Sequence, residues 1–428
     1  MIIEIKPEET GGEIQIPPSK SISHRAVFAA SLANGTSRIT NIMLSDDIKA
    51  TIEAARSFGA EIIAEPEEDG LFTLMITGTP EPRTRDCLID CGESGSTVRF
   101  LIPLAAVDAD NTVITGGGRL PERPLGPIVR ILKEQGFSVD QGEKELPLIM
   151  SGELKSGRFE LPGDVSSQFI TGLMLALPLL EGDSEIVLTT PLESRPYVEI
   201  TIDILAKFGI EIQERSDRVY FIEGSQAYKP NSLEVEGDFS QAAFWLVNGT
   251  INKETVCLGL PEHSVQGDYA VIDILRRTDA SIEWDPKRRA WIATPEPTRS
   301  FRLDAADIPD LVPVLSVAAA LSPGKTEIHN AARLRRKESD RLESVRQMLA
   351  AFGASCTATA DGLIIEGGSG FTGADIKSYS DHRIAMAAAI ASGRASDPVF
   401  IDHAECVSKS WPGFWEDFED CGGAVEEH

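Results

Sequence analysis

The segment 20–25, Lys-Ser-Ile-Ser-His-Arg, places two cations beside hydroxyl and imidazole groups, directly before a run of apolar residues. The apolar run predicts a buried helix that ends before Gly35. Unpaired N–H groups and a partial positive charge make a helix N-terminus attractive to anions. With Lys20 and Arg25 added, the segment indicates a site for a phosphate or a carboxylate. Taken alone, it also fits a capped core helix with two solvated charges.

This pattern of a polar start and an apolar helix recurs along the chain. The starts are 73, 71, 73, 70 and 71 positions apart, at Ser23, Ser96, Ser167, Ser240, Asp310 and Asp381. A second series keeps the same period and consists of amphipathic helices that end, before an expected strand, at Gly59, Gly136, Gly209, Asp279, Gly353 and Gly422. Two series with one period predict six copies of a unit that holds a buried helix, an amphipathic helix and several strands.

The length of the chain sets the domain count. Because 428 residues are too many for one ordinary core, we expect two α/β domains of three copies each. The fourth copy begins near residue 236. We therefore place an N-terminal domain at 18–236 and a second domain at 1–17 together with 237–428.

Charge and composition exclude several classes of partner. The formal net charge of −27 argues against nucleic acid and against anionic membrane surfaces. The longest apolar run, 169–180, is too short to span a bilayer, and the first residues lack the layout of a signal peptide. The six cysteines are scattered without a Cys-x-x-Cys pair, which argues against zinc and fits reduced thiols. We expect a cytoplasmic protein with no membrane or nucleic-acid partner.

Further polar motifs stand at or near the other expected helix starts. They are the glycine-rich 91–99, the loop 116–124 with Arg119 and Arg123, 164–168, 194–197, 307–310, the basic run 333–341, 380–383 and 408–412. Small residues let a backbone approach a ligand, and arginine suits bidentate contact with carboxylate or phosphate. Each motif also has a plainer interpretation, such as a solvated arginine, an N-capping serine or an exposed basic face.

Seven of these motifs in order resemble the 5-enolpyruvylshikimate-3-phosphate synthase family, and the resemblance covers nearly the whole chain. The matching segments are Pro-Ser-Lys-Ser-x-Ser-x-Arg at 18–25, Arg-Leu-x-x-Arg-Pro at 119–124, Ser-Ser-Gln at 166–168, Ile-Pro-Asp at 308–310, Lys-Glu-Ser-Asp-Arg at 337–341, Asp-His-Arg at 381–383 and Lys-x-Trp-Pro at 409–412. The resemblance implies two domains of three βαβαββ units each, an inside-out α/β barrel-like fold that closes on substrate in the cleft between the domains. The sixfold period agrees with this fold.

The resemblance also implies a reaction and the residues that perform it. The enolpyruvyl group of phosphoenolpyruvate would pass to the 5-hydroxyl of shikimate 3-phosphate, with release of phosphate. Shikimate 3-phosphate would be held by Lys20, Ser21, Arg25, Ser166, Ser167, Gln168, Ser194, Tyr197, Asp310 and Lys337. Phosphoenolpyruvate would be held by Lys20, Gly95, Arg123, Gln168, Arg341, Arg383 and Lys409.

An addition followed by an elimination requires groups that move protons at the reacting carbon atoms. We expect Asp310 to act as base at the 5-hydroxyl, Glu338 and Lys20 to transfer protons, and His382 to orient Glu338. The family implies no metal and no organic cofactor, and we expect a monomer that binds only small-molecule substrates. Cations of both domains should repel without ligand, so the open form should prevail until substrate anions bridge them.

The chain departs from the family pattern at Glu93 and Arg333, where asparagine is frequent, and at Gly117, where an acidic residue is frequent. A carboxylate at Glu93 would need a cation such as Arg99 beside it. Three rival interpretations remain: enolpyruvyl transfer to UDP-N-acetylglucosamine, a non-enzymatic repeat scaffold, and phosphate-end chemistry on RNA. Ser21, and a loop 115–124 without cysteine, argue against transfer to UDP-N-acetylglucosamine. The recurring cations argue against a non-enzymatic scaffold. The net charge of −27 argues against chemistry on RNA.

Overall fold

The computed structural model describes residues 1–67, 70–368 and 370–428 and divides the chain into two compact units. The N-terminal unit is Lys20–Val235, and the C-terminal unit combines Met1–Ser19 with Glu236–His428. Within these described ranges, every helix is too short or too polar to cross a membrane.

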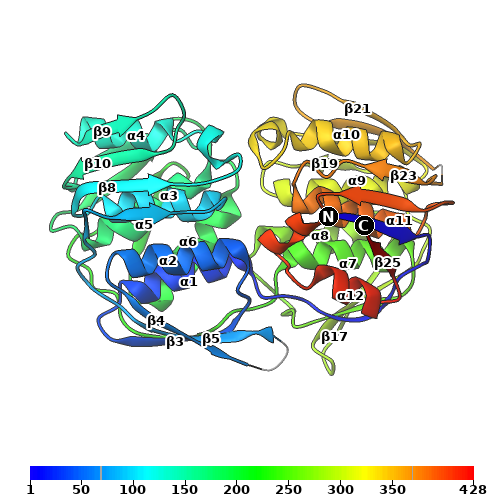
Figure 1. Cartoon of the computed structure of the whole chain (residues 1–428), viewed down its shortest axis with the longest axis horizontal. Helices are drawn as coiled ribbons and strands as arrows, with labels where there is room; N and C mark the ends of the chain where they lie inside the picture. The colour runs from blue at the N-terminus through cyan, green and yellow to red at the C-terminus, as the bar shows by residue number, and fades with distance from the viewer. Residues whose placement is uncertain (68–69, 369) are drawn as a thin grey trace. The chain divides into compact units, whose positions relative to one another are not determined.

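The N-terminal unit alternates buried helices, strands and amphipathic helices (Figure 1). Its helices are α1 (Lys20–Ser31), α2 (Asp46–Ser57), α3 (Gly95–Ala105), α4 (Gly126–Glu134), α5 (Ser167–Ala176) and α6 (Arg195–Lys207), with 3-10 turns η2 (Leu120–Glu122) and η3 (Leu177–Leu179). Its strands are β3 (Thr36–Ile42), β4 (Glu61–Pro66), β5 (Phe72–Thr77), β6 (Thr84–Arg85), β7 (Leu88–Asp90), β8 (Ala109–Thr115), β9 (Ser138–Gln141), β10 (Leu148–Gly152), β11 (Arg158–Leu161), β12 (Ser184–Leu188), β13 (Ile212–Ser216), β14 (Val219–Ile222) and β15 (Ser232–Glu234).

The C-terminal unit repeats this alternation. Its helices are α7 (Phe239–Ile251), α8 (Val271–Arg277), α9 (Val312–Leu321), α10 (Arg341–Ala351), α11 (His382–Ser392) and α12 (Phe414–Asp420), with 3-10 turns η4 (Gly267–Ala270), η5 (Pro309–Leu311), η6 (Ala332–Arg336) and η7 (Ala404–Lys409). Its strands are β1 (Ile2–Lys6), β2 (Gly12–Gln15), β16 (Thr255–Leu258), β17 (Ser281–Asp285), β18 (Ala290–Thr294), β19 (Arg302–Asp304), β20 (Gly324–His329), β21 (Ser355–Ala358), β22 (Leu363–Gly367), β23 (Ala374–Ile376), β24 (Val399–Asp402) and β25 (Ala424–Glu427).

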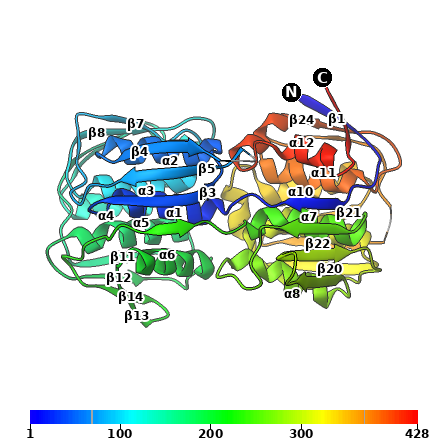
Figure 2. The same cartoon turned by 90° about the horizontal axis from the view of Figure 1, so that it is seen from below.

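The described strands form six sheets that share one plan, which is a βαβαββ unit. Figure 2 labels the strands of the sheet β11-β12-β14-β13 in this order. In this sheet, β11 is parallel to β12, and β14 is antiparallel to both of its neighbours. Because a parallel pair needs a crossover, the buried helix α5 connects β11 to β12. The amphipathic helix α6 then leads to the hairpin of β13 and β14.

Three sheets are completed by strands from distant parts of the chain. In the N-terminal unit, β15 lies parallel to β3 and supplies the first strand of the first copy. In the C-terminal unit, β2 pairs with β16 in the fourth copy, and β1 lies between β24 and β25 in the sixth. The first residues of the chain are therefore part of the C-terminal unit, which makes that unit discontinuous in sequence.

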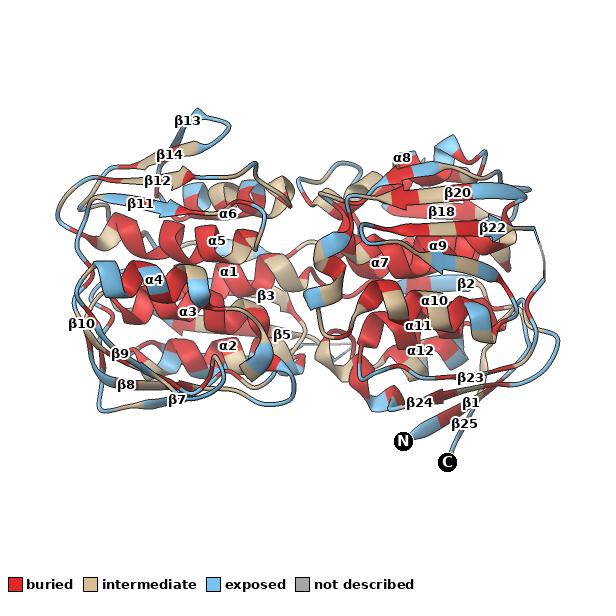
Figure 3. Cartoon of the chain, turned by 90° about the horizontal axis from the view of Figure 1, so that it is seen from above, coloured by how far each residue is buried: buried red, intermediate tan, exposed pale blue. Residues whose placement is uncertain are grey.

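The helices of the first series form the core of each unit. Figure 3 shows α1, α3 and α5, and likewise α7, α9 and α11, almost entirely in the colour of buried residues. In the C-terminal unit, α7 packs on β16 and β18, α9 on β22, and α11 on β24 and β1. The charged residues of these helices lie within the first two turns, and the polar residues farther along, such as Asn248 and Ser316, are uncharged.

The amphipathic helices end at a left-handed residue in all six copies. The φ angles are 110°, 88°, 81°, 84° and 90° at Gly59, Gly136, Gly209, Gly353 and Gly422, and 70° at Asp279. A glycine adopts this conformation without a steric cost, and an aspartate tolerates it better than most residues do. A strand follows each of these residues, as the sequence predicts.

Candidate active site

The start of α1 holds the first predicted cation. Lys20 is the first residue of this helix, and its Nζ lies 2.8 Å from Asp47 Oδ2 at the start of α2. Both side chains remain partly exposed, at 20% and 15%. Ser21 follows in the same turn and is also partly exposed. The two groups are therefore available to a ligand at this helix start, with Asp47 fixing the ammonium.

The imidazole of the opening motif has a structural role. His24 is buried, and its Nδ1 lies 2.6 Å from Thr51 Oγ1, which lies 2.7 Å from Thr97 Oγ1. Burial, followed by the charges of Lys20 and Arg25, holds the pKa of His24 well below its usual value. A neutral His24 in this chain of hydroxyl groups ties the starts of α1, α2 and α3 together.

Arg25 is a buried cation whose hydrogen bonds go to uncharged oxygen atoms. Its Nε donates to Thr201 Oγ1 at 2.8 Å and its Nη2 to the Tyr197 carbonyl oxygen at 2.9 Å. The guanidinium also lies 5.0 Å from the ring centre of Phe100. Burial lowers the pKa of Arg25 to about 9, so the group is still charged at neutral pH. An arriving anion would compensate this charge.

Arg123 lies directly against the first residue of α3. A Cβ atom on Gly95 would stand 2.5 Å from Arg123 Nη1, so only glycine allows the guanidinium to lie there. Ser94 caps α3 by accepting a hydrogen bond from the Thr97 N–H. The cation of the loop 116–124 is thereby held beside a helix N-terminus, which is the combination that favours an anion.

This packing predicts the effect of a methyl group at Gly95. If Arg123 binds phosphoenolpyruvate, as the resemblance implies, Gly95→Ala should displace its guanidinium and raise the KM for that substrate by about a hundredfold, because small misplacements of a binding group are costly. Steady-state kinetics with each substrate varied measures the effect, and the KM for shikimate 3-phosphate should change little.

The matched control for that experiment is Gly126→Ala. Gly126 also opens a helix, α4, but a Cβ atom there would meet no atom within 4 Å. Its kinetics should be those of the unmodified protein. Comparable increases of KM in the two variants would show that Arg123 is not the reason.

Gln168 is positioned by two neighbouring groups at the start of α5. Its Oε1 accepts a hydrogen bond from Arg99 Nη1 at 2.9 Å, and its Nε2 donates to Ser96 Oγ at 2.8 Å. Ser166 caps the helix by accepting from the Gln168 N–H, and Ser167 is buried in the first turn. The amide plane of Gln168 is therefore fixed before any ligand binds.

Ser194 and Tyr197 stand at the start of α6. Ser194 is buried and has a φ of 57°, the left-handed conformation, which makes the chain turn sharply into the helix. Tyr197 is half-buried, and its carbonyl oxygen accepts from Arg25 Nη2 at 2.9 Å. The start of α6 is thus tied to Arg25.

In the C-terminal unit, Arg341 lies at the centre of a cluster of carboxylates. Its guanidinium is 1% exposed and contacts three carboxylates, Asp310 at 2.6 Å, Glu338 at 2.7 Å and Asp381 at 2.8 Å. Although burial lowers the pKa of Arg341, the three carboxylates raise it well above its usual value. Asp381 caps α11 and also accepts from Ser339 Oγ at 2.9 Å, so the arginine is fixed to a helix start.

Asp310 is surrounded by cations. Arg341 and Lys337 lie 2.6 and 3.6 Å from its Oδ1, and Arg383 Nη2 lies 3.3 Å from its Oδ2. Burial raises the pKa of Asp310, but Arg383, Lys337 and Arg341 outweigh it and hold the pKa well below the usual value. Burial also lowers the pKa of Lys337 to about 8, which leaves this ammonium charged at neutral pH.

The remaining predicted residues lie in the first turn of α11, at the end of η7 and in the loop before α10. Arg383 and His382 are buried in the first turn of α11, and Arg383 Nη1 donates to the Asp310 carbonyl oxygen at 3.4 Å. Lys409, at the end of η7, donates to the Ser380 carbonyl oxygen at 3.0 Å. Glu338 lies in an ion pair with Arg341, and its orientation by His382 stays a prediction.

The basic run 333–341, which the sequence places at or near a helix start, is divided between a separate turn and the residues that lead into α10. Residues 332–336 form the separate turn η6, and Asp340 caps α10. Arg335 pairs with Asp340 at 2.8 Å, and Arg333 donates to the Ala306 carbonyl oxygen. Carboxylates therefore balance much of this run, and the helix that follows begins with an acidic cap.

Three residues of the site were not selected from the sequence. Asp47 holds Lys20, Arg99 holds Gln168, and Asp381 holds Arg341. The sequence suggests Arg99 only as a partner for Glu93, and the structure adds hydrogen bonds from Arg99 to Gln168 and to the carbonyl oxygens of Gly95 and Pro124. The N-cap position of Asp381, before an apolar helix, is a signal that the sequence does contain.

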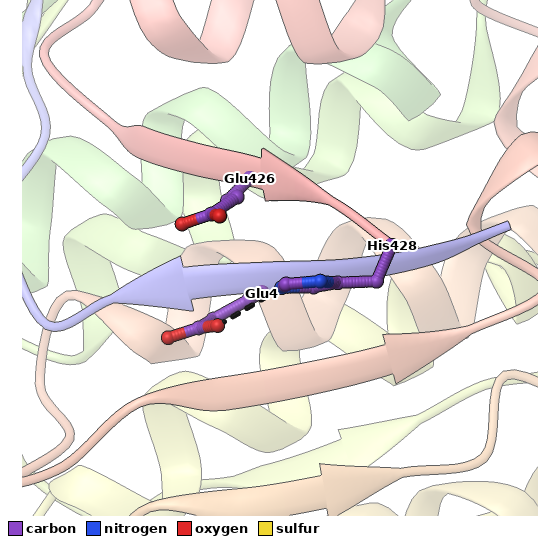
Figure 4. A group of neighbouring side chains, drawn as sticks. All are labelled: Glu4, Glu426 and His428. Carbon is purple, nitrogen blue, oxygen red and sulfur yellow. Dashed lines mark hydrogen bonds and ion pairs between the residues drawn. The ribbon is translucent and has the colours of Figure 1, made fainter.

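A separate group of side chains has the composition of a metal site. Glu4 on β1 and Glu426 and His428 at the end of the chain bring their ligand atoms within 4.8 Å of one another (Figure 4). Glu426 and His428 are exposed, and His428 Nε2 lies 3.0 Å from Glu4 Oε2. Exposed acidic groups of this kind also occur as ordinary surface contacts between paired strands.

Comparison with known proteins finds relatives that match nearly the whole chain. A family model for EPSP synthase, 3-phosphoshikimate 1-carboxyvinyltransferase, matches residues 5–418. The 3-phosphoshikimate 1-carboxyvinyltransferase of Clostridium kluyveri is 47% identical over 425 residues, 99% of this chain and 98% of the relative. That of Clostridioides difficile is 43% identical over 433 residues, again 99% of this chain and 98% of the relative.

Solved structures with the same fold extend this comparison. An EPSP synthase from Acinetobacter baumannii superposes with a TM-score of 0.82 at 28% identity and covers 100% of both chains. The enolpyruvyl transferase NikO from Streptomyces tendae has a TM-score of 0.78 at 16% identity, with 99% of this chain and 98% of that chain covered, and shares the fold alone.

Proposed function

The chain belongs to the EPSP synthase family, and we propose how its two clusters of helix starts share the two substrates of that family. The enzyme transfers the enolpyruvyl group of phosphoenolpyruvate to the 5-hydroxyl of shikimate 3-phosphate and releases phosphate, a step of aromatic amino acid biosynthesis. The match of the family model over residues 5–418 is the observation that carries this function.

We propose that shikimate 3-phosphate binds mainly to the N-terminal unit. Arg25 supports this assignment, because it is a buried cation whose hydrogen bonds go to neutral oxygen atoms and whose charge a phosphate would compensate. The starts of α1, α5 and α6 supply the other groups, namely Lys20, Ser21, Ser166, Ser167, Gln168, Ser194 and Tyr197. Asp310 and Lys337 of the C-terminal unit complete the proposed set.

Phosphoenolpyruvate carries a phosphate and a carboxylate, which suit several cations and helix N-termini. We assign it to Lys20, Gly95, Arg123 and Gln168 of the N-terminal unit and to Arg341, Arg383 and Lys409 of the C-terminal unit. The close packing of Arg123 on Gly95 and the burial of Arg341 and Arg383 support this assignment. These cations are held in place before any ligand arrives, which limits the entropy lost on binding.

Proton transfer is assigned to Asp310, Glu338 and Lys20. In the absence of substrate, three cations hold the pKa of Asp310 well below its usual value, which makes it a weak base. The substrate anions would neutralise Arg383, Lys337 and Arg341 and thereby raise this pKa, so the base would gain strength when both substrates are bound. Glu338 and Lys20 are partly exposed and can exchange protons with the methylene carbon and the leaving phosphate.

The proposed set draws residues from both units. All members of the set belong to one chain, which supports a monomer. The six cysteines of the chain are free thiols, which supports a reducing, cytoplasmic environment.

The proposal is tested by release of inorganic phosphate in the presence of phosphoenolpyruvate and an acceptor. Shikimate 3-phosphate should give rapid release that depends on both substrates, and UDP-N-acetylglucosamine should give none above background. The two acceptors need different contacts, and a site that hydrogen-bonds one acceptor discriminates by a factor of about 10⁴ or more. Faster release with UDP-N-acetylglucosamine would reject the proposal in favour of the sister activity.

A further inference from the structure

Asp268 stands in the fourth copy at a position that holds a residue of the site in each of the other copies. This position lies 11 to 13 residues before the left-handed residue that ends the amphipathic helix. Its occupants in chain order are Asp47, Arg123, Tyr197, Asp268, Arg341 and Lys409. Asp47 fixes Lys20, and the other four belong to the proposed substrate set. The repeat therefore places Asp268 where a role in the active site is expected.

The carboxylate of Asp268 is enclosed at the start of α7. It is 2% exposed, and its Oδ2 accepts a hydrogen bond from the Ser240 hydroxyl in the first turn of that helix. Its Oδ1 has no hydrogen-bond partner among the described residues. Besides Ser240, the charged groups that act on Asp268 are Asp238, the N-cap residue of α7, Asp310 of η5 and Arg383 of α11.

These neighbours bring the titration of Asp268 into the physiological range. Burial and then the negative charge of Asp310 raise its pKa, while Arg383 and the Ser240 hydroxyl lower it, and the result is about 7. Asp310 stays ionised throughout, because the cations around it hold its own pKa low. The carboxyl of Asp268 is thus neutral in mildly acidic solution and negative in mildly alkaline solution.

We propose that Asp268 is a positioning residue that controls how strongly Arg383 can bind the substrate anion. In its neutral form, Asp268 does not compete with the anion of phosphoenolpyruvate for the Arg383 guanidinium. In its ionised form, it competes for that guanidinium and repels the incoming negative charge. This inference rests on the proposed assignment of Arg383 to phosphoenolpyruvate.

The test compares Asp268→Asn with the unmodified enzyme from about pH 6 to about pH 9, at saturating shikimate 3-phosphate. The asparagine keeps the size of the neutral acid and cannot ionise. The ratio of the two KM values for phosphoenolpyruvate, unmodified over variant, should be near one at the acidic end and rise about tenfold at the alkaline end. The midpoint should lie near pH 7. Titration of the substrate phosphate affects both enzymes equally and cancels in the ratio.

The control variant is Asp417→Asn in the same unit. Asp417 accepts a hydrogen bond from Trp411 Nε1 at 2.6 Å, and burial raises its pKa to about 6, but it lies at the start of α12 among aromatic side chains. It should show the KM profile of the unmodified enzyme. A merely structural effect of either variant would change activity by a similar factor at every pH.

A second variant, Ser240→Ala, keeps the carboxylate and removes the hydrogen bond that favours its ionised form. It should move the midpoint of the KM profile to higher pH. A flat ratio for Asp268→Asn, or a KM raised more than about tenfold at the acidic end, overturns the inference. If Asp268→Asn does not fold, an unmoved midpoint in Ser240→Ala overturns it instead.

A wrong assignment of Arg383 to phosphoenolpyruvate would give a different experimental result. If Arg383→Ala leaves the affinity for phosphoenolpyruvate intact, the assignment of Arg383 is wrong, and the inference is withdrawn with it. If Arg383→Ala weakens that affinity while the KM ratio for Asp268→Asn is flat, only the role of Asp268 is wrong.

Discussion

Glu338→Gln should lower kcat by about a thousandfold while the affinity for shikimate 3-phosphate stays within about tenfold, because a positioned proton-transfer group contributes 10²- to 10⁴-fold. Glu338 is 25% exposed and bound to Arg341 at 2.7 Å, so its carboxylate is fixed and can still reach a substrate. The amide keeps the size of the side chain and removes the proton transfer. Rapid-quench kinetics with both substrates measures the step directly, and calorimetry measures the affinity.

Glu343→Gln is the matched control for this prediction. Glu343 lies in the first turn of α10, close in sequence to Glu338, and pairs with Arg346 at 2.5 Å on the surface. Its loss should leave kcat unchanged, because a surface ion pair of this kind contributes little. A turnover near that of the unmodified enzyme in Glu338→Gln would remove Glu338 from the mechanism.

Arg383→Ala should weaken the binding of phosphoenolpyruvate by about 3 kcal/mol, or somewhat more than a hundredfold, and that of shikimate 3-phosphate far less. The side chain is 6% exposed, and its Nη2 lies 3.3 Å from Asp310 Oδ2. Its removal takes away a buried cation that the proposal assigns to phosphoenolpyruvate. It also leaves Asp310 with fewer compensating charges, so the pKa of that carboxyl should rise in the variant.

Calorimetric titration with each substrate separates the two losses. Arg394→Ala serves as the control, because Arg394 follows the end of α11 and pairs with Glu9 on the surface at 2.7 Å. That variant should bind both substrates normally. Equal losses for the two substrates in Arg383→Ala would count against its assignment to phosphoenolpyruvate.

The repeat architecture could be predicted from the sequence because its signals are local. An apolar helix that begins with a polar turn, and a glycine that ends an amphipathic helix, each depend on a few neighbouring residues. The six left-handed residues and six sheets of the described chain confirm that reading. The exchange of β15 and β2 between distant copies has no local signal, because parallel pairing depends on residues far apart in sequence.

Most of the predicted site residues could be identified for the same reason, since they stand at or near the starts of helices. Their charge states could not, because a pKa depends on which groups burial and folding bring together. Arg341 meets carboxylates from η5, from the loop before α10 and from α11, while Asp310 meets three cations. Sequence thus determined the copies, their helix starts and the family. Only the tertiary structure decided that Asp47, Arg99, Asp381 and Asp268 stand beside the proposed binding groups, because side-chain contacts over such distances in sequence leave no periodic trace.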